Sequence, residues 1–130
     1  MYILTIRTDK PEAELGLFNN DQQLAYTKWM AHKQLATTIH AKIEQLLSKQ
    51  KLQFTSLNAI AVYKGPGSFT GLRIGITVAN ALAYSLNIPI ASNGSDDWLK
   101  KSLARLLAGE NETISLPEYG MEPHITKQIH

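Results

Sequence analysis

The spacing of the apolar residues changes near residue 31 and divides the chain into two kinds of predicted segment. Before that point, residues 2–7 alternate Ile and Leu with polar positions, as in a strand with one face toward a core. After it, residues 31–49 have apolar side chains at helical spacing. These apolar positions are Leu35, Ile39, Ile43, Leu46 and Leu47. The pattern therefore predicts strands first and an amphipathic helix afterwards.

Further strands and helices are predicted on either side of this helix. Residues 14–18 and 22–28 flank Asn19-Asn20-Asp21, which is typical of a hairpin turn. Residues 57–63 form an apolar strand expected to be buried on both faces, and residues 87–91 form a short strand. A second helix is expected to end at about Leu86, and a third to begin near Asp96-Asp97-Trp98 and stop at Gly109.

The resulting order, βββαβαβα, predicts an α/β domain with a mixed sheet. Three sequential strands form antiparallel hairpins, and strands separated by helices form right-handed parallel crossovers. Ribonuclease-H-like folds have this order, including each half of the actin and Hsp70 type (ASKHA) kinases. We therefore expect a single ribonuclease-H-like domain.

Composition narrows the class of protein. The chain has 130 residues, of which 44% are hydrophobic and 18% charged, values typical of one soluble globular domain. No apolar run reaches the ~18 residues needed to span a bilayer, and no basic region precedes an apolar stretch at the start, so a cytoplasmic location without membrane contact is expected. The absence of cysteine excludes thiol chemistry. A net charge of +2 does not indicate a nucleic-acid surface.

The segment from Lys64 to Gly75, Lys-Gly-Pro-Gly-Ser-Phe-Thr-Gly-Leu-Arg-Ile-Gly, carries the strongest functional signal. It joins the apolar strand to the second helix, and its glycines permit backbone conformations closed to other residues. One interpretation is a tight connection that needs glycine only for its geometry. The other is a cradle for a phosphate or nucleotide, formed by backbone amides and nearby polar side chains. Its candidate contacts are Gly65, Gly67, Ser68, Thr70 and Arg73.

Small residues recur at every fourth position of the second helix, at Gly71, Gly75, Ala79 and Ala83. Such a row makes one helix face nearly flat and permits another element to approach closely. The row could pack against another helix of the same domain or against a partner protein. Two glycines early in a helix cost about 1 kcal/mol each relative to alanine, so a close contact is expected to compensate.

The glycine string closely resembles the signature of the TsaB (YeaZ) family, which serves formation of threonylcarbamoyladenosine (t6A) in bacterial tRNA. The similarity extends to residues 2–8, 32–47 and 88–99, and so covers about the first hundred residues. The resemblance implies a non-catalytic subunit that binds TsaD, the subunit that transfers threonylcarbamoyl to N6 of adenosine 37. It also implies that the first two helices form the partner surface. The implied interface residues are Leu35, Ile39, Gly71, Leu72, Ile74, Gly75, Val78, Ala79 and Leu82.

The end of the chain also resembles this family. Residues 117–127 are similar to the family's C-terminal tail, with its prolines, tyrosine and Thr-Lys pair. Family members usually have a second domain before that tail, and only a few residues stand in its place here. We therefore expect a domain at 1–109, a tail at 110–130 and no second domain, as in a naturally minimal member of the family.

The sequence shows no arrangement of residues that is typical of a catalytic or metal site. Four histidines are present without an HxxxH pair, and we find no catalytic triad, Walker lysine or paired carboxylates, so neither an active site nor a metal site is predicted. The family and actin-like ATPases have an aspartate at the end of the first strand, where this chain has Arg7. A cation cannot coordinate Mg²⁺, and Asp9 follows only after the strand is expected to end. Arg7 itself could contact a phosphate or a partner's acid, or be a plain surface residue.

The resemblance also suggests partners. We expect TsaD as the heterodimer partner, with TsaE as a further candidate, a homodimer in isolation, and only indirect contact with tRNA. The chain needs no cofactor of its own, and ATP or ADP is considered only at the interface with TsaD. Two other interpretations stay open: an actin-like nucleotide-binding or phosphotransfer half-domain, and a regulatory pseudo-subunit that occupies the partner without supporting catalysis.

Overall fold

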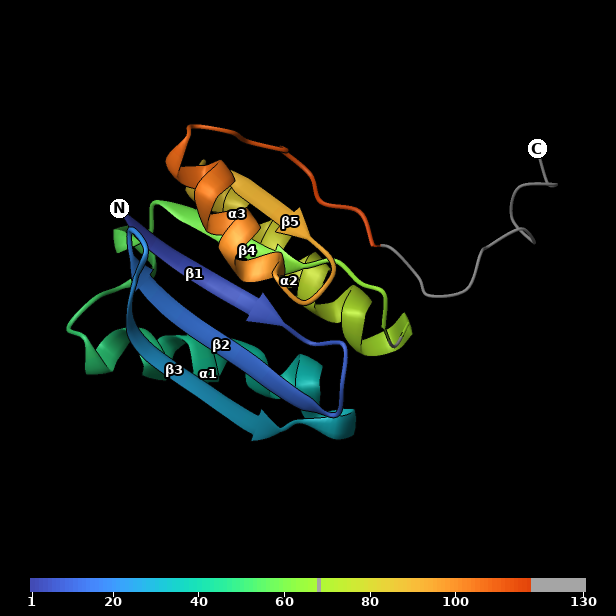
Figure 1. Cartoon of the computed structure of the whole chain (residues 1–130). Coiled ribbons are helices and arrows are strands. Elements are labelled where there is room, and N and C mark those ends of the chain that lie inside the picture. The colour runs from blue at the N-terminus through green and yellow to red at the C-terminus, as the bar shows by residue number, and fades with distance from the viewer. Residues whose placement is uncertain (68, 118–130) are drawn as a thin grey trace, which may run out of the picture.

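A five-stranded mixed sheet with helices on both faces forms the structure, a computed structural model that describes residues 1–67 and 69–117 (Figure 1). The strand order is β3-β2-β1-β4-β5. The strands are β1 (Tyr2–Arg7), β2 (Glu12–Asn19), β3 (Gln22–Met30), β4 (Ala59–Tyr63) and β5 (Ile90–Asn93). The helices are α1 (Leu35–Lys49), α2 (Phe69–Leu86) and α3 (Trp98–Leu107), with 3₁₀ turns η1 (His32–Gln34) and η2 (Phe54–Ser56).

The pairing of the strands confirms the predicted mixed sheet. β1 pairs antiparallel with β2 and β2 with β3, whereas β1 pairs parallel with β4 and β4 with β5. The predicted hairpin turn lies between β2 and β3, where Asn20 adopts a positive φ of 57°. The two parallel crossovers pass through α1 and α2, as the alternation of strands and helices predicted.

Apolar side chains from the sheet and all three helices form one core. α1 and α2 pack on one face of the sheet, and α3 packs over β4 and β5 on the other (Figure 1). All five residues of β4 are buried, which confirms the prediction for that strand. The apolar stripe predicted for α1 is also buried, from Leu35 to Leu47. None of the described helices is long and apolar enough to cross a membrane.

The last strand begins three residues later than predicted, at Ile90 rather than at Asn87. Asn87 has a positive φ of 56°, and the N–H of Ile88 donates to the carbonyl of Ala83 at 3.0 Å. These residues therefore terminate α2 instead of starting a strand. Pro89 has no N–H with which to pair, although its carbonyl accepts from the N–H of Ile60 at 3.0 Å.

Candidate partner interface

The glycine corner between β4 and α2 is packed too closely for side chains. Gly65 has a φ of 116°, which favours glycine, and the Gly65–Pro66 peptide bond is cis. A Cβ atom on Gly94 would collide with the carbonyl oxygen of Gly65. The loops that follow β4 and β5 therefore meet backbone to backbone, as a tight connection requires.

Asp9 covers the second glycine of the corner. A Cβ atom on Gly67 would collide with the Cβ of Asp9, whose side chain is 8% exposed. The Asp9 carboxylate accepts hydrogen bonds from Arg7 Nε at 2.8 Å and Arg7 Nη2 at 3.2 Å. An anion at Gly67 would therefore lie beside a carboxylate that already has its cation, and this arrangement disfavours a phosphate there.

Arg7 is engaged within the domain. Its guanidinium lies 4.1 Å from the centroid of the Tyr63 ring, and the Tyr63 hydroxyl donates to the Pro66 carbonyl at 2.8 Å. Trp98 meets the Tyr63 ring edge-on, with centroids 5.8 Å apart. The hydrogen bond to Asp9 raises the pKa of Arg7 further above its ordinary value. In this structure Arg7 is thus neither a plain surface residue nor a free phosphate ligand, because it braces the glycine corner.

The row of small residues on α2 faces the sheet. The hydroxyl of Thr8, just after β1, donates to the carbonyl of Gly71 at 2.7 Å, and a Cβ atom on Gly75 would collide with Thr8 Oγ1. Ala79 and Ala83 are 0% and 4% exposed. The flat face is therefore buried within the domain and approaches Thr8 closely at its two glycines, so neither a neighbouring helix nor a partner is needed to explain it.

This packing bears on the interface predicted from the sequence, which stays a prediction. Six of the nine residues are buried inside the domain and cannot present side chains to a partner in this conformation. They are Leu35, Ile39, Leu72, Gly75, Ala79 and Leu82. Gly71 is half-buried, with its carbonyl bound to Thr8. Only Ile74 and Val78 have partly exposed side chains, and both also pack against the core.

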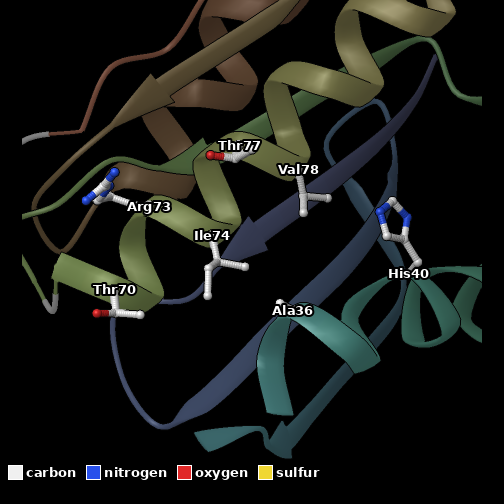
Figure 2. Close-up of a pocket in the computed structure, with 7 residues that line it drawn as sticks. All are labelled: Ala36, His40, Thr70, Arg73, Ile74, Thr77 and Val78. Atoms are coloured by element: carbon white, nitrogen blue, oxygen red, sulfur yellow. The ribbon is translucent and has the colours of Figure 1, made fainter. Parts of the chain in front are cut away.

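Those two residues lie in a surface groove of about 390 Å³ between α1 and α2 (Figure 2). Figure 2 shows Ile74 and Val78 on the side of α2 that faces α1. The groove is lined by Ala36 and His40 from α1 and by Thr70, Arg73, Ile74, Thr77 and Val78 from α2. This lining combines apolar and polar side chains with a single permanent charge, at Arg73.

The predicted phosphate contacts are divided between two places. Gly65 and Gly67 lie in the corner, whereas Thr70 and Arg73 are among the residues that line the groove. Ser68 lies outside the described residues. Contact with a phosphate or nucleotide at these residues remains a prediction.

The outer face of α2 carries few charges, a feature that the prediction from the sequence did not use. Arg73 is the only charged residue among the 18 of this helix, although Thr77, Ala81 and Tyr84 are exposed. Tyr84 is 89% exposed. Exposed helix faces usually carry charges, and aromatic residues with few charges are typical of interface centres. The scarcity of charge in α2 was the signal that sequence reasoning could have used.

Residues 110–115, which we call the strap, follow α3 and cover the free edge of β5. The N–H of Glu112 donates to the Ile90 carbonyl at 2.8 Å, and its carboxylate accepts from the Ser92 N–H at 2.6 Å. Glu112 also pairs with Arg105 at 2.7 Å. Further along, the Asn80 side chain on α2 binds the backbone of Ser115, with hydrogen bonds of 2.9 and 2.8 Å. This first part of the predicted tail is thus bound to the domain, and residues 118–130 lie outside the described residues.

Comparison with known proteins identifies relatives in one pathway. Residues 29–92 match the family model for TsaD, tRNA N6-adenosine threonylcarbamoyltransferase. The TsaB protein of Bacillus subtilis is 36% identical over 99 residues, which are 76% of this chain and 43% of the relative. The Escherichia coli TsaB protein is 30% identical over 114 residues, 83% of this chain and 49% of the relative. The chain thus spans less than half the length of these curated relatives.

Comparison with solved structures points to the same family of proteins. YeaZ from Pseudomonas aeruginosa superposes with a TM-score of 0.66 at 26% identity, over 72% of this chain and 43% of that protein. Thermus thermophilus RuvC, at 15% identity and a TM-score of 0.53 over 96% of this chain, shares the fold alone. The predicted ribonuclease-H-like fold is therefore confirmed. Together with the sequence matches, these similarities show that the chain belongs to the TsaB (YeaZ) family.

Proposed function

We propose that this chain is a non-catalytic subunit that binds a TsaD-type threonylcarbamoyltransferase and supports t6A formation in tRNA. The proposal is supported by family membership and by the groove between α1 and α2. The observation that carries it is the exposed and nearly uncharged outer face of α2, beside the half-exposed Ile74 and Val78. A surface of this kind gains stability when another protein covers it.

The proposed role is that of a partner rather than of a catalyst. Among the described residues, no group of three His, Asp or Glu side chains could hold a metal ion. The carboxylate nearest the glycine corner, Asp9, is paired with Arg7. In this proposal the transferase supplies the chemistry, and this chain stabilises its active conformation. ATP or ADP at the shared interface, TsaE as a further partner and a cytoplasmic location are secondary parts of the same proposal.

Reconstitution tests the function directly. The purified chain is mixed with the TsaD-type transferase and the other t6A enzymes of the same organism, and t6A is measured by mass spectrometry of digested tRNA. We expect modification that depends on the chain. Val78→Arg places a charge in the groove and should lower both binding and t6A yield at least tenfold. Gln22→Arg, at an exposed position of β3, is the matched control and should leave both unchanged.

The same experiment separates the other interpretations. A regulatory pseudo-subunit would bind the transferase and lower t6A formation. A nucleotide-binding half-domain would bind ATP alone in calorimetry, with dependence on Mg²⁺. Failure of the wild-type chain to bind the transferase would reject the proposed function.

A further inference from the structure

The groove between α1 and α2 continues into a second hollow at the N-terminal ends of the two helices. This hollow, also of about 390 Å³, shares Thr70 and Ile74 with the first. Its other lining residues are Lys10, Pro11, Ala31, His32, Lys33, Leu35 and Gly71. The two hollows together form one continuous surface, which we call the extended groove.

The extended groove is cationic. Lys10, Lys33 and Arg73 line it, and no carboxylate is among its described lining residues. All three cations are exposed, and none forms an ion pair with another described residue. By contrast, the other two described arginines, Arg7 and Arg105, are both paired with acids. Lysines elsewhere on the described surface, such as Lys49 and Lys51, also form no ion pair with a described residue, so the distinguishing feature of the extended groove is that three cations share one lining without a carboxylate among its described residues.

The backbone adds to this charge. α1 begins at Leu35 and α2 at Phe69, so both helix N-termini lie at the cationic end of the extended groove. Neither helix has an acidic residue in its first turn, where such residues are favoured. The helix dipoles and the three cations therefore act in the same direction and favour an occupant with negative charge.

We propose that the extended groove binds an acidic segment of the partner protein, with carboxylates opposite Lys10, Lys33 and Arg73 and apolar side chains on Ile74 and Val78. This inference rests on the proposed function and specifies the chemistry of the partner at that site. The choice of occupant follows from charge complementarity. A second copy of the chain would offer one exposed carboxylate along the same stripe of α1, Glu44, which follows Ala36 and His40 at four-residue spacing. One carboxylate does not match three cations.

Charge reversal tests the inference. We expect Lys33→Glu with Arg73→Glu to weaken binding to the transferase at least tenfold in low salt, and the difference to shrink as salt is added. Lys49→Glu with Lys51→Glu is the control, because it makes the same change of net charge at exposed positions near the other end of α1. It should have little effect. Circular dichroism establishes that both double variants fold.

Several outcomes would overturn the inference. One is wild-type affinity of the groove variant together with binding that salt does not affect. Another is a homodimer that the variant loses while it still binds the transferase, which would make a second copy the occupant. A third is loss of the charge-reversal effect in a chain ending at Pro117, which would assign the groove to the chain's own terminal segment.

The failure of the inference can be told apart from failure of the proposed function. If the wild-type chain does not bind the transferase, a glutamate-rich helical peptide serves as the probe, with its lysine-substituted counterpart as control. Nuclear magnetic resonance shifts at Ala36, Ile74 and Val78 with the acidic peptide alone would support the inference. Equal shifts with both peptides, or none with either, would overturn it.

Discussion

The Cβ of Asp9 lies too close to the position that a Cβ of residue 67 would take, so Asp9 and Gly67 allow only one side chain between them. Gly67→Ala should therefore lower the free energy of unfolding by about 1–3 kcal/mol, because the corner has to shift. Urea denaturation measures this change. In an Asp9→Gly background the same substitution should lower the free energy of unfolding by clearly less. Equal costs in the two backgrounds would show that this contact does not limit the corner.

Substitution by arginine should lower the stability of the fold strongly at one residue of α2 and only slightly at its neighbour. Ala79 is 0% exposed beneath the helix, whereas Val78 lies half-exposed in the groove. Ala79→Arg buries an unpaired cation and should cost about 3 kcal/mol or more of stability. Val78→Arg should cost less than about 1 kcal/mol and act on partner binding instead. Thermal melts of both variants measure this difference in stability. Similar melting temperatures would contradict an orientation of α2 that buries Ala79 and leaves Val78 in the groove.

The hydroxyl of Tyr26 donates a hydrogen bond to Glu14 Oε1 at 2.7 Å. Partial burial, followed by this hydrogen bond, raises the pKa of Tyr26 to about 12. The folded state thus favours the neutral phenol. The resulting stabilisation is complete below the ordinary pKa of about 10 and is lost as the pH rises through about 12. We expect the phenolate absorbance to show a transition near the raised value that Tyr26→Phe removes and Glu14→Gln moves toward lower pH. An unchanged titration curve in Tyr26→Phe would refute this.

The two hydrogen bonds between Asn80 and the backbone of Ser115 hold the end of the strap on α2. Asn80→Leu keeps the approximate shape and removes both bonds, so it should cost about 1–2 kcal/mol. Hydrogen exchange gives a local readout, since the Ser115 amide should lose protection while β1 and β4 keep theirs. Thr77→Ala, one turn earlier on an exposed site, should leave that amide protected. Protection that survives in Asn80→Leu would mean that other contacts hold the strap.

Much of the fold could be predicted from the sequence, because its signals are local. The strands of residues 2–28 alternate, the α1 stripe has helical spacing, and the order of elements fixes a mixed sheet. The orientation of α2 could not be obtained in this way. A row of small residues is consistent with close approach to any neighbour, and the neighbour that decides it, Thr8, is 67 residues from Gly75 in the chain. The pairing of Arg7 with Asp9 was missed because it depends on the turn after β1.

The predicted interface stays a prediction, but the structure shows that most of its residues are buried in the domain's own core. The apolar positions that define a helix pattern are those that its own core buries, as Leu35, Ile39 and Leu72 are. A partner surface is formed by the residues that the core leaves exposed. Its signal in the sequence is a scarcity of charged residues at those positions rather than a pattern of apolar ones. In α2 that signal is the single arginine among its 18 residues.

The strap has a consequence for how this domain can assemble. Glu112 satisfies the backbone of Ser92 and Ile90 at the β5 edge, where another strand would otherwise find open donors and acceptors. One backbone N–H and one carboxylate, unlike a full strand, end the ladder and offer no new edge to the next molecule. Growth of this sheet from one copy to another is thereby blocked at β5, so association through its helices can stop at a defined stoichiometry instead of propagating into fibres.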